Sequence, residues 1–298
     1  MRHRPDRIAE WPTLALIGLC YAIWAVGTTW LSAAWLPLGI AATAVSVALF
    51  SSLQHEIIHG HPFRNQNLNA ALVSPGLSVL IPYLRFRDTH LDHHLNAELT
   101  DPYDDPESNY LDPAVWRRLP KVLQAVLIFN NTLLGRLLIG VAVSQVAFML
   151  GDWRAARAGD WRVWRGWLWH IPALVPVALW LGLAGQMPLW AYLIAAYAGL
   201  ALVKIRTFLE HQAHERKTGR TAIIEDRGPL ALLFLNNNLH VVHHMHPKVA
   251  WYRLPRLYFS NRERYLARNG GYFYRSYAQI FRRHLLRTTD PVPHPFWR

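Results

Sequence analysis

Histidine is the residue type whose arrangement in this sequence could carry chemistry. The pattern His-x-x-His-His occurs twice, about 150 residues apart, and two smaller clusters have spacings of i, i+4 and i, i+3. On a helix, residues at these spacings lie on one face, so each cluster would direct its imidazoles at a common point. The clusters are His55 and His59; His90, His93 and His94; His211 and His214; and His240, His243 and His244.

Adjacent imidazoles are costly to bury unless they share a partner. A transition metal is the partner that suits neutral nitrogen donors, so the clusters predict a large metal site. The isolated histidines lack such spacing, and we expect them to be ordinary structural residues: His3, His170, His284 and His294.

The composition is that of a membrane protein. Hydrophobic residues make up 52% of the 298 residues, charged residues 17%, and there are 14 tryptophans. Trp favours the membrane interface. The net charge of +12 would also suit nucleic acid, but the arginines flank apolar stretches together with Trp and Tyr, so we expect no nucleic-acid partner. The single cysteine, Cys20, excludes an intrachain disulfide and a cysteine contribution to the metal site.

Four apolar stretches are long enough to cross a bilayer, and they predict helices over residues 11–31, 34–53, 166–184 and 188–207. The first is too long for a signal peptide and is followed at once by the second, so we expect it to be retained. Short uncharged linkers, 32–35 and 185–188, join the helices into two hairpins. Arginines precede the first and third helices: Arg2, Arg4, Arg7, Arg154, Arg157, Arg162 and Arg165. By the positive-inside rule, both hairpins begin and end in the cytoplasm.

The sequence therefore predicts an all-α integral membrane protein of the inner (plasma) membrane, in which residues 1–298 form a single domain. Residues 54–165 and 208–298 would form a cytoplasmic helical cap that carries the histidine-rich metal site, with both termini on the same side. Because the clusters must share one side, residues 69–83 and 121–150 would be interfacial or re-entrant. In the basic C-terminal segment, an amphipathic helix would lie on anionic lipid through Tyr274, Tyr277, Ile280, Phe281 and Leu285.

These motifs, in this order around two hairpins, resemble those of the membrane-bound fatty-acid desaturases over about residues 11–257. The first is His-Glu-x-x-His at 55–59, and the second is Thr-His-Leu-Asp-His-His at 89–94. The third is Asn-Asn-Leu-His-Val-Val-His-His at 237–244, followed by Trp-Tyr-Arg-Leu-Pro. The resemblance implies a non-haem centre of two irons that uses O₂ as co-substrate and two electrons to remove hydrogens from an alkyl chain.

The resemblance also implies a ligand set. It comprises His55, His59, His90, His93, His94, His211, His240, His243 and His244. His214, His61 and His246 are weaker candidates, and no catalytic residue beyond the metal centre is indicated. Three acidic residues adjoin these histidines and could accept hydrogen bonds from their distal ring N–H groups: Glu56, Asp92 and Glu210.

Two other functions remain open. The sequence His55-Glu56-Ile57-Ile58-His59 also matches the His-Glu-x-x-His motif of a membrane zinc protease, in which the glutamate would be the general base. Such a site needs only three protein ligands, which leaves the matched triplets unexplained. Within the desaturase-like family, the same ligands could serve a hydroxylase or a carotenoid ketolase.

The expected partners are the membrane, a lipid or acyl substrate of unspecified carrier, and an external electron donor such as a ferredoxin or a cytochrome b5-like protein. The printed sequence holds no His-Pro-Gly-Gly haem motif, no cysteine cluster and no Gly-x-Gly-x-x-Gly loop. The donor would dock where the arginine-rich segments concentrate.

Overall fold

The computed structural model describes residues 9–95 and 98–297. His3 and the arginines at positions 2, 4 and 7, on which part of the sidedness prediction depends, lie outside the described residues. The described residues form two compact units: unit 1 comprises those within 1–88, 144–203 and 248–250, and unit 2 comprises those within 89–143, 204–247 and 251–298. The single-domain organisation expected from the sequence stays a prediction.

Among the described residues, four helices are long and apolar enough to cross a membrane, which confirms the predicted all-α fold with four spans. They cover Trp11–Ala34, Leu36–Ile58, Trp161–Leu183 and Leu189–Thr207. The first consists of α1 (Trp11–Val26), the π-helical turn η1 (Gly27–Leu31) and α2 (Ser32–Ala34), and the others are α3, α10 and α11. Three predicted boundaries were wrong: the first span ends at Ala34 rather than 31, α3 continues through His55 to Ile58, and α10 begins five residues early, at Trp161 rather than 166.

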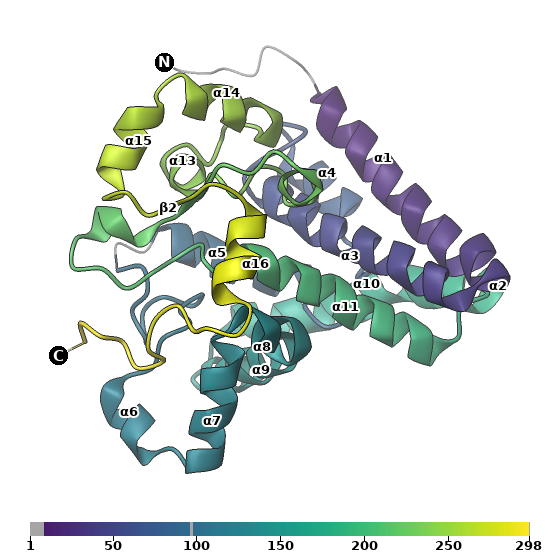
Figure 1. The fold of residues 1–298 in the computed structure, drawn as a ribbon. Helices are drawn as coiled ribbons and strands as arrows, with labels where there is room; N and C mark the ends of the chain where they lie inside the picture. The colour runs from purple at the N-terminus through teal and green to yellow at the C-terminus, as the bar shows by residue number, and fades with distance from the viewer. Residues whose placement is uncertain (1–8, 96–97, 298) are drawn as a thin grey trace. The chain divides into compact units, whose positions relative to one another are not determined.

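The first hairpin is tight because small residues line its contact. Only Trp35, with extended backbone, separates α2 from α3, so the linker is shorter than predicted. A Cβ on Gly39 would lie 2.2 Å from the Ser32 Oγ, and one on Gly27 would lie 2.7 Å from the Thr43 Oγ1. The two helices therefore approach backbone to backbone, and Figure 1 shows them side by side in purple and blue.

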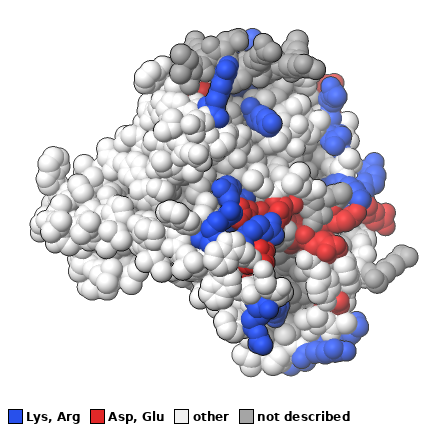
Figure 2. Space-filling model, turned by 180° about the vertical axis from the view of Figure 1, so that it is seen from behind, with Lys and Arg blue, Asp and Glu red and all other residues white. Residues whose placement is uncertain are grey.

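Polar contacts bind the second hairpin to the first within unit 1. The backbone N–H groups of Gln186 and Met187, at the turn between α10 and α11, both donate to the Thr28 carbonyl. The Trp180 indole donates to the Thr28 hydroxyl over 3.0 Å. A Cβ on Gly199 would lie 2.6 Å from the Ala44 carbonyl oxygen, so α11 packs directly on α3. On the face shown in Figure 2, the surface of these hairpin tips carries no charged side chain.

A buried ion pair fixes the beginning of α5 (Tyr83–Leu95), the helix that carries the second histidine cluster. The Arg85 guanidinium contacts both carboxylate oxygens of Asp152 on α9 (Gly140–Arg157), with a shortest distance of 2.8 Å. Trp167 on α10 donates to the same carboxylate over 2.8 Å. A buried ion pair is stable only when its hydrogen bonds have good geometry. The Arg85–Asp152 pair therefore fixes how α5 is rotated about its axis.

The two apolar stretches predicted not to cross are interrupted. Within residues 69–83 the structure has the end of α4 (Gln66–Leu72), then a loop up to Tyr83, the first residue of α5. Residues 121–150 form three helices, α7 (Lys121–Asn130), α8 (Leu133–Leu138) and α9, with a break at Asn131 and Thr132. The interruption agrees with an interfacial location, whereas the side of the membrane on which each lies stays a prediction.

Unit 2 contains the remaining short elements. They are α6 (Pro113–Arg118), η2 (Lys217–Arg220), β1 (Ile223–Ile224), α12 (Pro229–Leu233), α13 (His240–Met245), η3 (Trp251–Arg253), α14 (Leu254–Phe259), α15 (Arg262–Arg268), β2 (Phe273–Tyr274) and α16 (Tyr277–His284). Strands β1 and β2 pair in parallel, with Ile223 opposite Phe273. The prediction for the C-terminal helix was wrong: Tyr277 and Ile280 are buried, and the Tyr277 ring packs edge-on against Phe234 at 5.6 Å. Its apolar face covers the core of unit 2 rather than lipid.

We expect thiol labelling to reveal the sidedness of the four spans. In a Cys20→Ser background, single cysteines would replace three exposed residues: Leu95, Arg157 and Gln186. A membrane-impermeant maleimide added to intact cells should label only the Gln186→Cys protein, because both hairpins are predicted to turn on the outer side. Labelling of Leu95→Cys or Arg157→Cys before the cells are permeabilised would contradict the predicted topology.

Candidate metal centre

Seven of the nine predicted histidine ligands belong to unit 2. Both His-x-x-His-His patterns are helical, as their spacing predicts: one ends α5 and the other forms α13. The seventh histidine, His211, follows α11. The six histidines of the two patterns are therefore presented from helix faces, and the seventh from an irregular segment.

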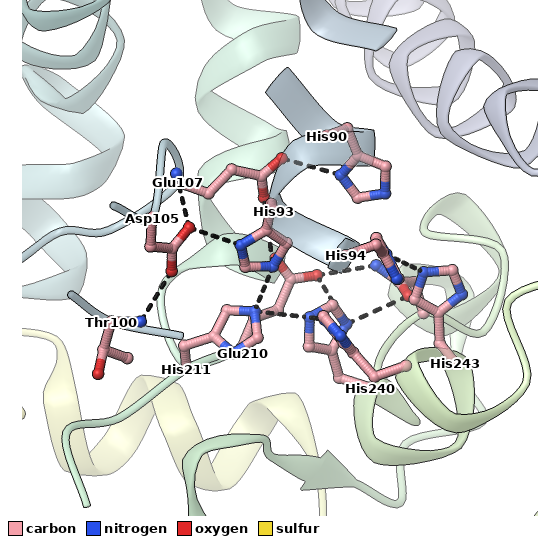
Figure 3. A network of polar contacts seen from close by, with 12 residues as sticks. His90, His93, His94, Thr100, Asp105, Glu107, Glu210, His211, His240 and His243 are labelled. Atoms are coloured by element: carbon pink, nitrogen blue, oxygen red, sulfur yellow. Dashed lines mark hydrogen bonds and ion pairs between the residues drawn. The ribbon is translucent and has the colours of Figure 1, made fainter. Parts of the chain in front are cut away.

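Four of these side chains converge on one point. The ligand atoms of His93, His211, His240 and His244 all lie within 4.8 Å of one another. Neighbouring Nε2 atoms are 3.1 Å apart between His93 and His211, 3.0 Å between His211 and His240, and 3.1 Å between His240 and His244. Figure 3 shows the three labelled members of this group, His93, His211 and His240, with their rings facing one another. We call these residues the four-histidine set.

The other three histidines of unit 2 form a second group beside it. The Nε2 atoms of His94 and His243 are 3.1 Å apart. The His90 ring lies 4.6 Å from the His94 ring, centroid to centroid, and the His94 ring lies 4.9 Å from that of His243. The rings of His94 and His244 stack at 4.3 Å, so the two groups adjoin.

Hydrogen bonds at the opposite ring nitrogens orient these imidazoles. The Nδ1 of His93 lies 2.7 Å from the Asp105 carboxylate, and that of His90 lies 2.8 Å from Glu107. The Nδ1 of His240 lies 3.3 Å from the Asn237 side-chain oxygen. Since each partner atom is an acceptor, each Nδ1 carries a proton, and in the neutral ring the Nε2 presents a lone pair.

This arrangement fits a metal cation. A pair of facing Nε2 atoms could share one proton, but His211 faces two neighbours and so does His240. Several lone pairs that converge in a buried space repel one another unless a cation lies among them. A carboxylate or amide that fixes the distal ring nitrogen is the usual outer partner of a metal-bound imidazole. The residues present therefore suit a transition metal bound through nitrogen.

Burial keeps most of these imidazoles neutral, which is the form that binds a metal. Burial and the neighbouring His90 lower the pKa of His94 to about 3, and burial and His93 lower that of His211 to about 3. For His240 and His244, burial again dominates and lowers the pKa well below the ordinary value. His93 differs: burial lowers its pKa, but Glu107 and Asp105 outweigh that effect and raise it to about 9.

The acidic loop after the second cluster provides the two carboxylates that orient α5. Asp105 is buried and also accepts the Thr100 N–H over 2.7 Å and the Glu107 N–H over 3.0 Å. Burial alone would raise the pKa of Glu107, but His93 and His90 face its carboxylate and lower the pKa below its ordinary value. Sequence reasoning missed Asp105, Glu107 and Asn237. The dense acidic run directly after His90–His94 was the available signal for the first two.

The predicted acidic partners lie in different surroundings. Glu210 is buried, lies 3.0 Å from Arg206, accepts the Asn237 side-chain amide over 2.9 Å and lies 3.5 Å from the His240 Nδ1. Burial raises its pKa. Asp92 is exposed on α5. Glu56 belongs to unit 1 and is described below.

The segment after α11 is not helical, so the predicted shared face of His211 and His214 was wrong. His211 forms an isolated β-bridge with Thr221, which directs its ring toward the four-histidine set. The His214 Nδ1 accepts the Arg216 N–H over 3.0 Å instead. His246 follows the last residue of α13, and its ring lies 6.3 Å from Tyr265.

A strained turn leads into the third cluster. Leu235 and Asn236 have φ values of 52° and 56°, in the left-handed region that non-glycine residues rarely adopt. The Asn236 N–H donates to the Ala231 carbonyl, and its side-chain amide donates to Trp251 over 3.1 Å. The turn reverses the chain after α12 so that Asn237 and α13 follow, and such strain is characteristic of functional sites.

The first cluster belongs to unit 1. His55 occupies the last turn of α3 and His59 caps it, with ring centroids 5.0 Å apart. The His61 Nδ1 lies 2.9 Å from the Glu10 carboxylate, and its Nε2 lies 3.8 Å from that of Glu56. The assignment of His55 and His59 as ligands and of Glu56 as a partner stays a prediction.

Comparison with known proteins agrees with this arrangement. No curated protein matches the chain. The model of the family described as "Fatty acid desaturase" matches residues 28–277, which include all four histidine clusters, His61, His246 and three of the four apolar spans in full. This match covers most of the chain, and the chain therefore belongs to the fatty acid desaturase family.

Proposed function

We propose that the protein is an O₂-dependent desaturase that introduces a C=C bond into the alkyl chain of a fatty-acyl lipid or a related substrate. The family makes it an oxidoreductase of the desaturase or hydroxylase type that is associated with a membrane. The observation that carries the proposal is the four-histidine set, whose nitrogen donors converge on one point and of which burial keeps His211, His240 and His244 neutral.

Two irons are the metals proposed. The four-histidine set would hold one, and His90, His94 and His243 would contribute to the other. His55 and His59 would complete the second set, and their support is the motif order and their i, i+4 spacing on α3. When bound, the irons would supply the activation of O₂ needed to attack an unactivated C–H bond.

The chain's own residues would hold the metals and orient the imidazoles that bind them. Asp105, Glu107 and Asn237 would keep three imidazoles in the Nδ1–H form, with their Nε2 atoms fixed toward the metals. Desaturation converts –CH₂–CH₂–, O₂, two electrons and two protons into –CH=CH– and two waters. The electrons would come from an external donor, for which a ferredoxin or a cytochrome b5-like protein is proposed, on the cytoplasmic side of the plasma membrane.

A zinc protease built on His55, Glu56 and His59 is the less favoured reading. It would give no role to the seven histidines gathered in unit 2 or to the carboxylates that orient them. Zinc in place of iron, with peptide cleavage, would support it.

We expect the reaction to remove two vicinal hydrogens without adding oxygen. A host that expresses the protein would be fed perdeuterated fatty acids under ¹⁸O₂, and its lipids would be compared with those of a host that expresses His211→Ala. The wild-type host should accumulate lipids that have lost two deuteriums and gained no ¹⁸O. A product that carries ¹⁸O would reassign the enzyme as a hydroxylase or ketolase.

A separate assay tests the external electron donor. In membranes, turnover with NAD(P)H alone, after removal of soluble proteins and cytochromes, would contradict an external donor.

A further inference from the structure

Unit 2 has an open cavity of about 510 Å³ between α12 and α14, apart from the histidine groups. Two kinds of side chain line it. Arg227 and Arg256 supply positive charge, while Leu232, Pro255 and Phe259 supply apolar surface.

The two arginines are available for an anion. Among the described residues, neither forms an ion pair with a carboxylate, and no acidic residue lines the cavity. Glu225, two residues before Arg227, pairs with Arg262 and accepts the Tyr258 hydroxyl, and it attracts Arg227 only from beyond ion-pair distance. The Arg227 guanidinium stacks over the Phe259 ring at 4.0 Å, which fixes its plane and leaves its N–H edge free of the ring. Two guanidinium groups on one cavity are a typical phosphate site.

The apolar wall indicates that the ligand also carries hydrocarbon. Leu232 is 55% exposed and Phe259 is 37% exposed, although both line a concave surface. Water is a poor partner for such side chains, so an alkyl group placed on them would be stabilised by the area it buries. A ligand that can contact both the arginines and the apolar side chains is an anionic amphiphile. Phospholipid is such a ligand, and it surrounds a protein with four membrane spans.

We propose that this cavity binds a membrane phospholipid, with its phosphate between Arg227 and Arg256 and the start of an acyl chain on Leu232 and Phe259. Asn236 forms part of the wall, and the next residue, Asn237, contacts both Glu210 and His240. The residue that would contact the lipid, Asn236, is therefore the chain neighbour of Asn237, whose hydrogen bonds orient the third histidine cluster. This inference does not depend on the reaction proposed above.

Calorimetric titration of the full-length protein in a nonionic detergent tests the proposal. The probes are dihexanoyl-phosphatidylglycerol, inorganic phosphate and uncharged dihexanoylglycerol. The phosphatidylglycerol should bind at least about tenfold more tightly than either of the others, because only it contacts both walls. Arg227→Gln and Arg256→Gln should each weaken the binding of phosphatidylglycerol about tenfold. Leu232→Ser should lower the affinity for phosphatidylglycerol until it is close to the affinity for phosphate.

Arg264→Gln is the matched control, because it removes one exposed arginine of α15 that does not line the cavity. It should leave all three affinities unchanged, and circular dichroism would verify that every variant is folded. Wild-type affinity in the Arg227→Gln, Arg256→Gln double variant would overturn the proposal. Equal binding of dihexanoylglycerol would make the cavity a purely apolar site, and equal binding of phosphate would make it a free-anion site. Either result also overturns the phospholipid assignment.

Discussion

His211→Ala is expected to lower the bound iron from about two atoms per chain to about one and to abolish detectable turnover. His211 is central to the four-histidine set, since its Nε2 faces His93 at 3.1 Å and His240 at 3.0 Å. Its removal leaves three imidazoles around an enlarged space, so that metal would be bound by one imidazole fewer and would dissociate more readily during purification. Elemental analysis of the purified protein measures the metal, and the lipid assay measures turnover.

His214→Ala is the matched control for that variant, since it removes an imidazole three residues away whose Nδ1 accepts a backbone N–H instead. It should retain both metals. His55→Ala tests the other set independently: it should also lose about one iron, while the double variant with His211→Ala should lose about two. Two irons retained in His211→Ala, or one zinc and no iron in the wild type, would contradict the assignment.

Asp105→Asn is expected to weaken metal binding by about 10- to 100-fold without removing a ligand. The carboxylate accepts the His93 Nδ1–H through one oxygen and the Thr100 N–H through the other. An amide can accept only one of these bonds and must present its own N–H₂ to the other donor. The His93 ring would then lose its fixed orientation and part of its basicity. Competition with a chelator of known affinity measures the change.

Asp104→Asn removes the same charge one position earlier, from an exposed side chain of the same loop. It separates the specific hydrogen bond from a general loss of negative charge, and its metal affinity should stay within about twofold of the wild type. Equal weakening in both variants would show that Asp105 acts through the charge of the loop alone.

The sequence predicted the regular parts of this protein well, because their signals are periodic. A run of about 20 apolar residues suffices to identify a span, and all four spans were found. The His-x-x-His-His spacing predicted helix faces, and α5 and α13 confirm it. The boundaries were less accurate, because the apolar signal stops before the hydrogen-bonded helix does. Thus α3 continues into the first histidine cluster.

The irregular parts could not be predicted from local patterns. His211 reaches its neighbours through a β-bridge with Thr221, a contact that no spacing within residues 210–214 specifies. Asp105 lies 12 residues from His93, and their pairing depends on how the loop folds back. The C-terminal helix was assigned to lipid because an amphipathic pattern does not say what covers its apolar face; in the structure Phe234 does.

The left-handed turn at Leu235 and Asn236 limits how far this protein could be stabilised by engineering. Glycine is the usual remedy for such backbone, and it would relieve about 1 kcal/mol at each position. Glycine would not help at either position here. The Leu235 residue is 3% exposed, so removal of its side chain would leave a cavity, and replacement of Asn236 would remove the hydrogen bond from its side-chain amide to the Trp251 carbonyl. Selection for thermostability should therefore leave both residues unchanged and find its gains elsewhere, for example on the exposed faces of unit 2.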